Sequence, residues 1–321
     1  MSGTLVFLEH HGDELQKGSL GVLSKAAQLG GEVAAVVVGS GVEQLAPAAG
    51  EFGAGTVFVA DDPRLEVPLP QPRVDVVAEL VRERDFENVL FAQSILTADV
   101  AAALAARLDA GLNWQLVDVV ADGGGLVGRQ SALGDSVVVD VGWRSTPRLA
   151  LFRAGAFDPV ARGGAASVET VEPRLEEHSL AAEMLEQAHE ESTGPSIEDA
   201  DVIVAGGRGL GAPEGFGLIE ELAKALGGAV AATRAVVDAG WYPYAAQVGQ
   251  TGKSVSPTLY VACGISGAIQ HKVGMQSSKV IVAINKDANA PIFEFADLGV
   301  VGDLHQIVPK LTELVRARRS S

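Results

Sequence analysis

Residues 247–271 read QVGQTGKSVSPTLYVACGISGAIQH, and this stretch decides the fold of the C-terminal part of the chain. The run TLYVACG (258–264) is short, apolar and bounded by turn residues, which predicts a buried strand. The Ser-Gly-Ala sequence at 266–268 is typical of a helix start, and His271 follows one turn into that helix. A glycine-rich loop, a strand and a helix start in this order predict the wall of a nucleotide-cofactor site.

The sequence around this stretch alternates strands and helices. Apolar runs that end at glycine or polar residues are followed by segments with apolar residues at helical spacing. This pattern predicts a doubly wound, mainly parallel α/β domain, in which ligands bind at the carboxyl ends of the strands. We expect a strand and glycine turn over 201–211, strands over 229–234, 258–264, 279–287 and 296–303, and helices over 213–228, 265–275 and 304–319.

The first part of the chain shows the same alternation before its rhythm changes. Near-continuous apolar strands between helices predict a second parallel sheet, covered on both faces. Residues 113–155 instead alternate strands with glycine turns, so we predict antiparallel hairpins added to this domain. The expected strands are 4–9, 32–39, 56–61 and 87–94, and the expected helices are 16–30, 72–85, 97–108 and a weaker one over 42–53.

A Glu-rich segment over 169–199 separates the two parts. It loses apolar content, contains TGPS at 193–196, and predicts a connector with one exposed helix near 180–191. Domain boundaries fall in such polar linkers. We therefore place an N-terminal α/β domain at 1–190 and a second domain at 191–321.

Composition excludes several classes of protein. Cys263 is the only cysteine among the 321 residues, which excludes internal disulfides, CxxC redox pairs and thiolate metal sites. No run of 18 apolar residues occurs, so direct membrane insertion is not expected. The N-terminal sequence lacks the pattern of a signal or transit peptide, so we expect a soluble, cytoplasmic protein.

The net charge of −17 is unevenly distributed. Residues 1–200 hold 31 acidic and 13 basic side chains, whereas residues 201–321 hold 10 acidic and 11 basic side chains. The acidic first part argues against a nucleic-acid partner. The more basic second part suits an anionic ligand such as a diphosphate, although ordinary variation in surface charge explains the split equally well.

Three short motifs resemble other nucleotide sites and fail on inspection. Residues 207–212 fit the G-x-G-x-x-G/A pattern, but the next strand ends in Thr233-Arg234, where an NAD site needs an acidic residue. Residues 252–254 resemble the end of a P-loop, but Gln247 stands where that motif needs glycine. The NKDA sequence at 285–288 lacks the final Asp of a guanine-specificity motif. An NAD-dependent dehydrogenase and an NTPase are therefore rejected.

The C-terminal sequence resembles the electron-transfer flavoprotein alpha subunit in order and over its whole length. The N-terminal part is similar more loosely, through FAQSILTADVAAALAARL and RAGAFDP. The segments that carry the resemblance are GGRGLG (206–211), TRAVVDAGW (233–241), QVGQTGK (247–253), CGISGAIQH (263–271), AINKDANAPIF (283–293) and ADLGVVGDL (296–304).

The resemblance implies that the second domain is a Rossmann-like domain that binds one FAD. The implied cofactor-binding residues are Arg208, Thr233, Arg234, Val248, Gly249, Gln250, Thr251, Ser266, Gly267, Ala268, Ile269, Gln270, His271, Asn285, Asp303 and Leu304.

Three of these residues are expected to tune the redox potential. A reduced flavin gathers negative charge at its N1 and C2 carbonyl edge, so Arg234 as a fixed cation and His271 as a hydrogen-bond donor would stabilise it. Thr251 would offer its hydroxyl to the flavin N5. Structural alternatives remain open: an ion pair for Arg234, a packing role for His271 and an ordinary turn hydroxyl for Thr251.

The other implied contacts also have plain structural alternatives. Gly249 would let backbone N–H groups approach the cofactor, and Arg208 would reach the diphosphate. Ser266 opens a helix start that favours phosphate or is a simple cap. Asn285 and Asp303 each end a strand, where Asp303 could accept from ribose or adenine and both could equally be caps.

The resemblance further implies an electron carrier without a substrate reaction of its own, and no nucleophile–base pair accompanies the site. The implied partner is a beta subunit holding AMP or a second FAD, with the first domain at the subunit interface. Flavin dehydrogenases such as acyl-CoA dehydrogenases of fatty acid beta-oxidation would donate electrons, and a membrane quinone oxidoreductase would accept them. The alternatives are an electron-bifurcating complex using NADH and a nucleotide-binding regulatory module without redox activity.

Overall fold

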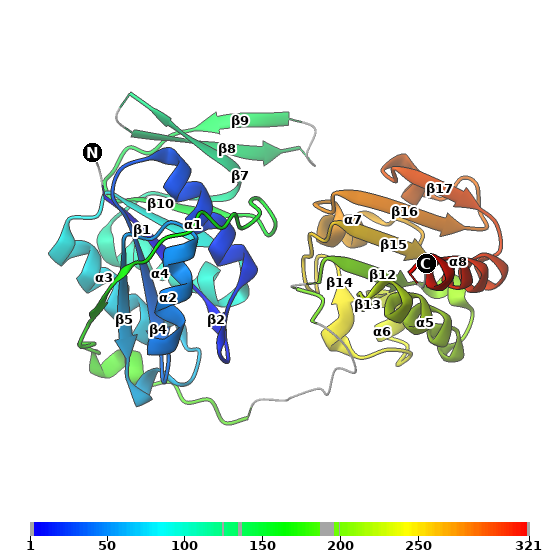
Figure 1. The fold of residues 1–321 in the computed structure, drawn as a ribbon, viewed down its shortest axis with the longest axis horizontal. Coiled ribbons are helices and arrows are strands. Elements are labelled where there is room, and N and C mark those ends of the chain that lie inside the picture. The colour runs from blue at the N-terminus through cyan, green and yellow to red at the C-terminus, as the bar shows by residue number, and fades with distance from the viewer. Residues whose placement is uncertain (1–2, 124, 134–136, 187–195, 199, 320–321) are drawn as a thin grey trace. The chain divides into compact units, whose positions relative to one another are not determined.

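The computed structural model describes residues 3–123, 125–133, 137–186, 196–198 and 200–319. The chain forms two compact units, Met1–Gln187 and Ala188–Ser321 (Figure 1). Each unit is built on a largely parallel sheet flanked by helices, and the first unit adds antiparallel strands, which confirms the predicted fold class.

The first unit has a nine-stranded sheet with the order β11-β5-β4-β1-β6-β10-β7-β8-β9. Leu5 and Phe7 of β1 pack with α3 and α4, whereas Val6 and Leu8 pack with α1 and α2, since successive side chains of a strand point to opposite faces. The sheet is therefore covered on both faces. Its strands are β1 (Thr4–Leu8), β4 (Val33–Gly39), β5 (Thr56–Asp61), β6 (Asn88–Ala92), β7 (Leu112–Asp122), β8 (Gly125–Ala132), β9 (Val137–Val141), β10 (Arg148–Phe152) and β11 (Ser167–Thr170); its α-helices are α1 (Lys17–Leu29), α2 (Ala46–Glu51), α3 (Pro70–Arg84) and α4 (Ile95–Leu108).

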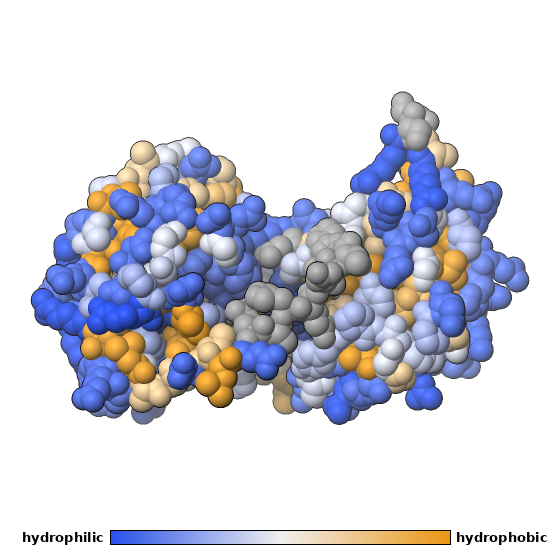
Figure 2. Space-filling model, turned by 90° about the horizontal axis from the view of Figure 1, so that it is seen from below, coloured by the Kyte–Doolittle hydropathy of each residue, from blue (hydrophilic) through white to orange (hydrophobic). Residues whose placement is uncertain are grey.

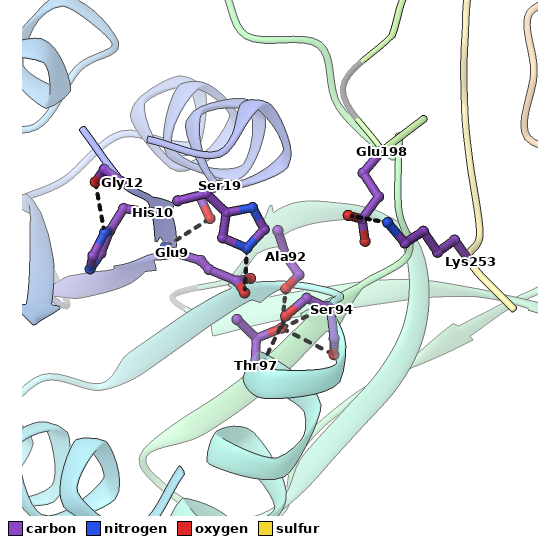
Figure 3. A network of polar contacts seen from close by, with 10 residues as sticks. Glu9, His10, Gly12, Ser19, Ala92, Ser94, Thr97, Glu198 and Lys253 are labelled. Atoms are coloured by element: carbon purple, nitrogen blue, oxygen red, sulfur yellow. Dashed lines mark hydrogen bonds and ion pairs between the residues drawn. The ribbon is translucent and has the colours of Figure 1, made fainter. Parts of the chain in front are cut away.

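A capping box shortens the predicted strand over 87–94. The Ser94 hydroxyl accepts a hydrogen bond from the Thr97 backbone N–H at 3.0 Å, and the Thr97 hydroxyl accepts from the Ser94 N–H at 2.8 Å (Figure 3). The two side chains thereby satisfy amide groups at the start of α4. The helix consequently begins at Ile95, two residues earlier than predicted.

The prediction that residues 113–155 form only antiparallel hairpins is wrong for β10. Strands β7, β8 and β9 are antiparallel neighbours, as expected. Strand β10 instead lies between β6 and β7 and is parallel to both. Its sequence RLALF is nearly all buried, which is typical of a central strand in a parallel sheet.

The predicted connector starts too early and its helix is misplaced. Residues 167–170 form β11, which pairs in parallel with β5 and so completes the first sheet. A 3-10 helix covers Glu177–Leu180, and residues 181–186 contain no helix. The remainder of the helix predicted near 180–191 lies outside the described residues.

The second unit has a six-stranded sheet, order β14-β13-β12-β15-β16-β17, in which every neighbouring pair is parallel. Helices α5 and α8 pack on one face and α7 on the other. The helix predicted over 265–275 begins only at Ile269, because Gly264 and Gly267 adopt left-handed φ values of 64° and 87°. The elements are β12 (Val202–Gly206), α5 (Phe216–Leu226), β13 (Ala229–Thr233), α6 (Arg234–Val237), β14 (Gln247–Val248), β15 (Leu259–Cys263), α7 (Ile269–Met275), β16 (Val280–Asn285), β17 (Leu298–Val301) and α8 (Leu304–Arg319).

The surface of each unit mixes residue types. Figure 2 shows apolar residues interspersed among hydrophilic ones on the visible face. Within the described residues, no helix has the length and apolar content needed to cross a bilayer.

Candidate functional site

The predicted site residues lie along one edge of the second sheet. Because all six strands run in the same direction, their carboxyl ends share that edge, which is where parallel α/β sheets bind ligands. The topology therefore brings together residues that are far apart in sequence. Thr233, Val248 and Asn285 end strands β13, β14 and β16, while Arg208, Ser266 and Asp303 follow strands β12, β15 and β17.

The two central strands meet at the switch point of the sheet. From β12 the chain proceeds outward through β13 and β14, and from β15 it proceeds the other way through β16 and β17. Backbone hydrogen bonds join the loop after β12 to the end of β15 and its loop: Gly207 N–H donates to the Cys263 carbonyl at 3.0 Å, and Gly209 N–H donates to the Gly264 carbonyl at 2.9 Å. A Cβ at Gly207 would lie 2.5 Å from the Gly264 carbonyl oxygen, so this crossing requires glycine.

The loop after β14 is a tight turn held by its own backbone. Lys253 N–H donates to the Gln247 carbonyl at 2.8 Å, and Gly249 N–H donates to the Lys253 carbonyl at 3.1 Å. Gln250 N–H donates to the Gln270 carbonyl at 2.7 Å, which ties the loop to α7. A Cβ at Gly252 would lie only 2.3 Å from the Gln247 carbonyl oxygen. The position of this turn against α7 is therefore fixed.

Thr251 lies at the tip of this turn with an exposed side chain. Its carbonyl oxygen accepts hydrogen bonds from Tyr244 Oη at 2.9 Å and from Gln247 Nε2 at 3.0 Å. Gln247 Nε2 also lies 3.2 Å from Thr251 Oγ1. The turn is thus held both by its backbone and by two side chains that were not among the predicted site residues.

His271 is buried, with 6% of its surface exposed, and both ring nitrogens have partners within the protein. Nδ1 lies 3.0 Å from the Val248 carbonyl oxygen, and Nε2 lies 3.0 Å from Tyr260 Oη. A carbonyl can only accept, so Nδ1 carries the proton and Nε2 accepts from the Tyr260 hydroxyl. Burial lowers the pKa of His271 to about 4, so the ring is neutral near pH 7.

The sequence predicted that His271 donates to a flavin carbonyl, and in this geometry both of its ring nitrogens are engaged within the protein. A neutral ring with its one proton donated to Val248 has no N–H to offer to a flavin carbonyl. His271 instead fixes the backbone at the start of the glycine-rich turn and supplies the buried Tyr260 hydroxyl with an acceptor. Tyr260 was missed as a partner, although a tyrosine hydroxyl in an otherwise apolar strand always raises the question of what it bonds.

Two arginines at this edge are accessible to a ligand. Arg208 is exposed in a short 3-10 helix after β12. Arg234 begins α6, and its Nε lies 3.1 Å from Asp238 Oδ2 with 63% of the arginine side chain exposed. An exposed ion pair of this kind contributes little, so Arg234 can change partner at small cost.

Asn285, Asp303 and Leu304 have structural roles that the sequence left open. Asn285 Nδ2 donates to the Ile265 carbonyl at 2.9 Å and so ties the end of β16 to the loop after β15. Asp303 Oδ1 accepts from His305 N–H at 3.0 Å, which caps the start of α8. Leu304 is a buried core residue, so only its backbone is available to a ligand.

The segment between β15 and α7 offers backbone groups, and Ser266 and Ala268 are exposed in it. Ile292 N–H donates to the Ser266 carbonyl at 3.0 Å, and a Cβ at Gly267 would lie 2.3 Å from that Ile292 nitrogen. Ala268 is the N-cap of α7, and Ile269 is 74% exposed. The first turn of a helix leaves N–H groups without intrahelical partners, and such groups favour anionic ligands.

These residues fit an FAD. Glycines let the loops after β12 and β15 and the turn after β14 pack closely at this edge, two exposed guanidinium groups lie at the same edge, and Thr251 offers an exposed hydroxyl. Within the described residues, no cluster of His, Cys, Asp and Glu suits a metal ion. A flavin dinucleotide needs this combination of backbone approach, cationic groups and hydrogen-bond donors.

Comparisons with known proteins agree with the site. The family described as "Electron transfer flavoprotein domain" matches residues 4–177, and the "Electron transfer flavoprotein FAD-binding domain" matches residues 196–276. The electron transfer flavoprotein subunit alpha of Mycobacterium tuberculosis (strain H37Rv) is 43% identical over 321 residues, covering 99% of this chain and 100% of that protein. Protein FixB of Clostridium saccharobutylicum is 41% identical over 317 residues, covering 96% and 95% of the two chains. The electron transfer flavoprotein subunit alpha of Thermoanaerobacterium thermosaccharolyticum is 38% identical and covers 97% of both chains. This chain therefore belongs to the electron-transfer flavoprotein alpha subunit family.

Proposed function

We propose that this chain carries one FAD in its second unit and passes electrons from flavin dehydrogenases, such as acyl-CoA dehydrogenases, to a membrane quinone oxidoreductase. Its relatives are electron carriers rather than enzymes with a substrate reaction of their own. The observation that carries the proposal is the convergence of the glycine turns, two arginines and the Thr251 hydroxyl on one edge of a parallel sheet. The bound FAD supplies the electron chemistry, while the protein supplies binding and electrostatics.

The predicted residues would bind different parts of the FAD. The backbone around Gly249, Gln250, Gly267 and Ala268 would contact the cofactor, and Arg208 would supply positive charge for the diphosphate. The other predicted residues would contact the isoalloxazine, ribityl or adenosine part of the FAD through their backbone or side chains. They are Thr233, Val248, Ser266, Ile269, Gln270, Asn285, Asp303 and Leu304.

Two side chains would set the redox properties. Thr251 would donate its hydroxyl hydrogen to the flavin N5. Arg234 would exchange its exposed contact with Asp238 for the carbonyl edge of the flavin, where a cation stabilises the charge of the reduced ring. His271 would act through position alone, by holding Val248 at the base of the turn.

Membership of the alpha subunit family implies a beta subunit as partner. We propose that this partner holds AMP or a second FAD and that the acidic first unit supplies part of the subunit interface. The same chain would serve an electron-bifurcating complex with NADH if the beta subunit carried a second flavin. We expect the complex in the cytoplasm.

Co-purification with the beta subunit tests the proposal. A yellow complex with a flavin spectrum and one FAD for each alpha subunit is the expected result, and Arg208→Ala should weaken FAD binding. The cofactor count of the beta subunit separates the carrier from the bifurcating complex. A colourless complex that binds no FAD on reconstitution would instead support a nucleotide-binding module without redox activity.

A further inference from the structure

Gln247 is a buried polar residue directly beside the proposed flavin-binding turn. Only 2% of its surface is exposed, and it is the first residue of β14, opposite Ala232 of β13. Its carbonyl oxygen accepts from Lys253 N–H, while its side chain reaches across the turn to Thr251. Both ends of this residue are therefore engaged in closing the same turn.

The hydrogen bonds fix which way the Gln247 amide faces. Its terminal nitrogen lies 3.0 Å from the Thr251 carbonyl oxygen, which can only accept. The group facing Thr251 must therefore be the NH2 and not the amide oxygen. The same NH2 lies 3.2 Å from Thr251 Oγ1, so that oxygen is the acceptor in this contact.

The consequence falls on the single hydrogen of the Thr251 hydroxyl. A hydroxyl that accepts from Gln247 keeps its own hydrogen available for a different partner. The Thr251 carbonyl oxygen does not require the hydroxyl hydrogen, because Tyr244 Oη and Gln247 Nε2 already donate to that oxygen. The hydroxyl is thus arranged as a donor toward the exposed side of the turn.

We propose that Gln247 is a positioning residue that makes the Thr251 hydroxyl a hydrogen-bond donor toward the flavin N5, and so tunes the flavin potential. The inference rests on the proposed function, with the flavin seated beside Thr251. A fixed donor favours the redox states in which N5 has a lone pair and disfavours the state in which N5 carries a hydrogen. Loss of Gln247 frees the hydroxyl to rotate and accept.

The test is a double-mutant cycle on the complex of both subunits with FAD bound. Gln247→Met keeps an unbranched side chain of similar size and removes the donor. It should increase the equilibrium constant of the reduction step that protonates N5 about tenfold. This corresponds to a rise of ~59 mV in the potential of that step for one electron. In a Thr251→Val background, the same substitution should shift the potential no more than Tyr244→Phe does, because the hydroxyl through which Gln247 acts is gone.

Tyr244→Phe is the matched comparison. It removes the other side-chain donor to the Thr251 carbonyl and leaves the hydroxyl untouched. Any effect that Tyr244→Phe shares with Gln247→Met reports loosening of the turn, seen also as weaker FAD affinity. Only the additional shift of Gln247→Met measures the polarity of the hydroxyl.

The possible outcomes separate this inference from the proposed function. If Thr251→Val shifts the potential and Gln247→Met does not, or shifts it equally in both backgrounds, the role of Gln247 is wrong and the site stands. If Thr251→Val itself leaves the potential unchanged, Thr251 does not face N5 and this inference is wrong, whereas the proposed function is overturned only if the wild-type complex binds no FAD. Should Gln247→Met not fold, Gln247→Glu gives a carboxylate that accepts the hydroxyl hydrogen, and coupling to Thr251→Val remains the criterion.

Discussion

The buried pair of His271 and Tyr260 predicts a specific dependence of stability on pH. In the folded chain, burial lowers the pKa of His271 from 6.5 to about 4. In the unfolded chain, the ring regains its ordinary pKa and takes up a proton as the pH falls below 6.5. The stabilisation is therefore fully present above pH 6.5 and is lost as the pH falls toward 4.

The size of the effect follows from the two pKa values. Each unit of pKa difference is worth 1.36 kcal/mol. Linkage then predicts that the free energy of unfolding of the second unit falls by roughly 2 kcal/mol between pH 7 and pH 5, and by about 3 kcal/mol at pH 4. The neighbouring titratable groups do not interfere, because burial raises the pKa of both Tyr260 and Cys263, the latter to about 12.

Hydrogen exchange of the β15 amides measures this change in the second unit alone, once intrinsic exchange rates are corrected for pH. His271→Gln removes the titrating ring and should show a much smaller change between pH 7 and pH 5 than the wild type. His305→Gln, a substitution of an exposed histidine in the same unit, should keep the wild-type response. Equal pH responses in the wild type and His271→Gln would refute the assignment of a buried neutral histidine.

Three further predictions concern the same edge of the sheet. Gly252→Ala places a Cβ 2.3 Å from the Gln247 carbonyl oxygen, so it should destabilise the turn by about 1–3 kcal/mol and weaken FAD binding in fluorescence titrations. Gly217→Ala, whose Cβ would meet no atom within 4 Å apart from the neighbouring backbone of its own helix, should bind FAD normally. Arg234→Ala should lower the flavin midpoint by about 10–40 mV, the equivalent of an exposed charge pair, and an unchanged redox titration would remove Arg234 from the electrostatic role. Asp303→Ala removes a helix cap and should cost about 1 kcal/mol in urea unfolding, with Asp303→Asn as the variant that retains most of it.

The sequence alone was sufficient to predict which residues share one edge of the second sheet. Apolar runs ending at Thr233 and Asn285 identify strands, and a parallel sheet necessarily brings their carboxyl ends together. The direction in which each side chain points depends on tertiary partners. His271 could not be placed, because its orientation is set by Val248 and by Tyr260, eleven positions away on another element.

The order of strands in the first sheet likewise could not be predicted from the sequence. RLALF at 148–152 is a short apolar run, and periodicity cannot distinguish a hairpin strand from a central parallel strand. Its position between β6 and β7 depends on long-range pairing. The same holds for β11, whose sequence SVET is mostly exposed and has no apolar pattern that would attract attention.

The late pairing of β11 with β5 has a consequence for synthesis of the chain on the ribosome. Thr56 and Ser167 share a hydrogen bond across 111 positions, so β5 remains an open edge until most of the first unit has been translated. Open edges can pair with other chains, and non-local pairing is slow. We therefore expect nascent chains ending near residue 160 to be aggregation-prone and those extending past residue 200 to be protected, whereas the second unit, whose sheet spans only 202–301, can close without waiting for a distant strand. Proteolysis of stalled ribosome complexes of both lengths would measure the difference.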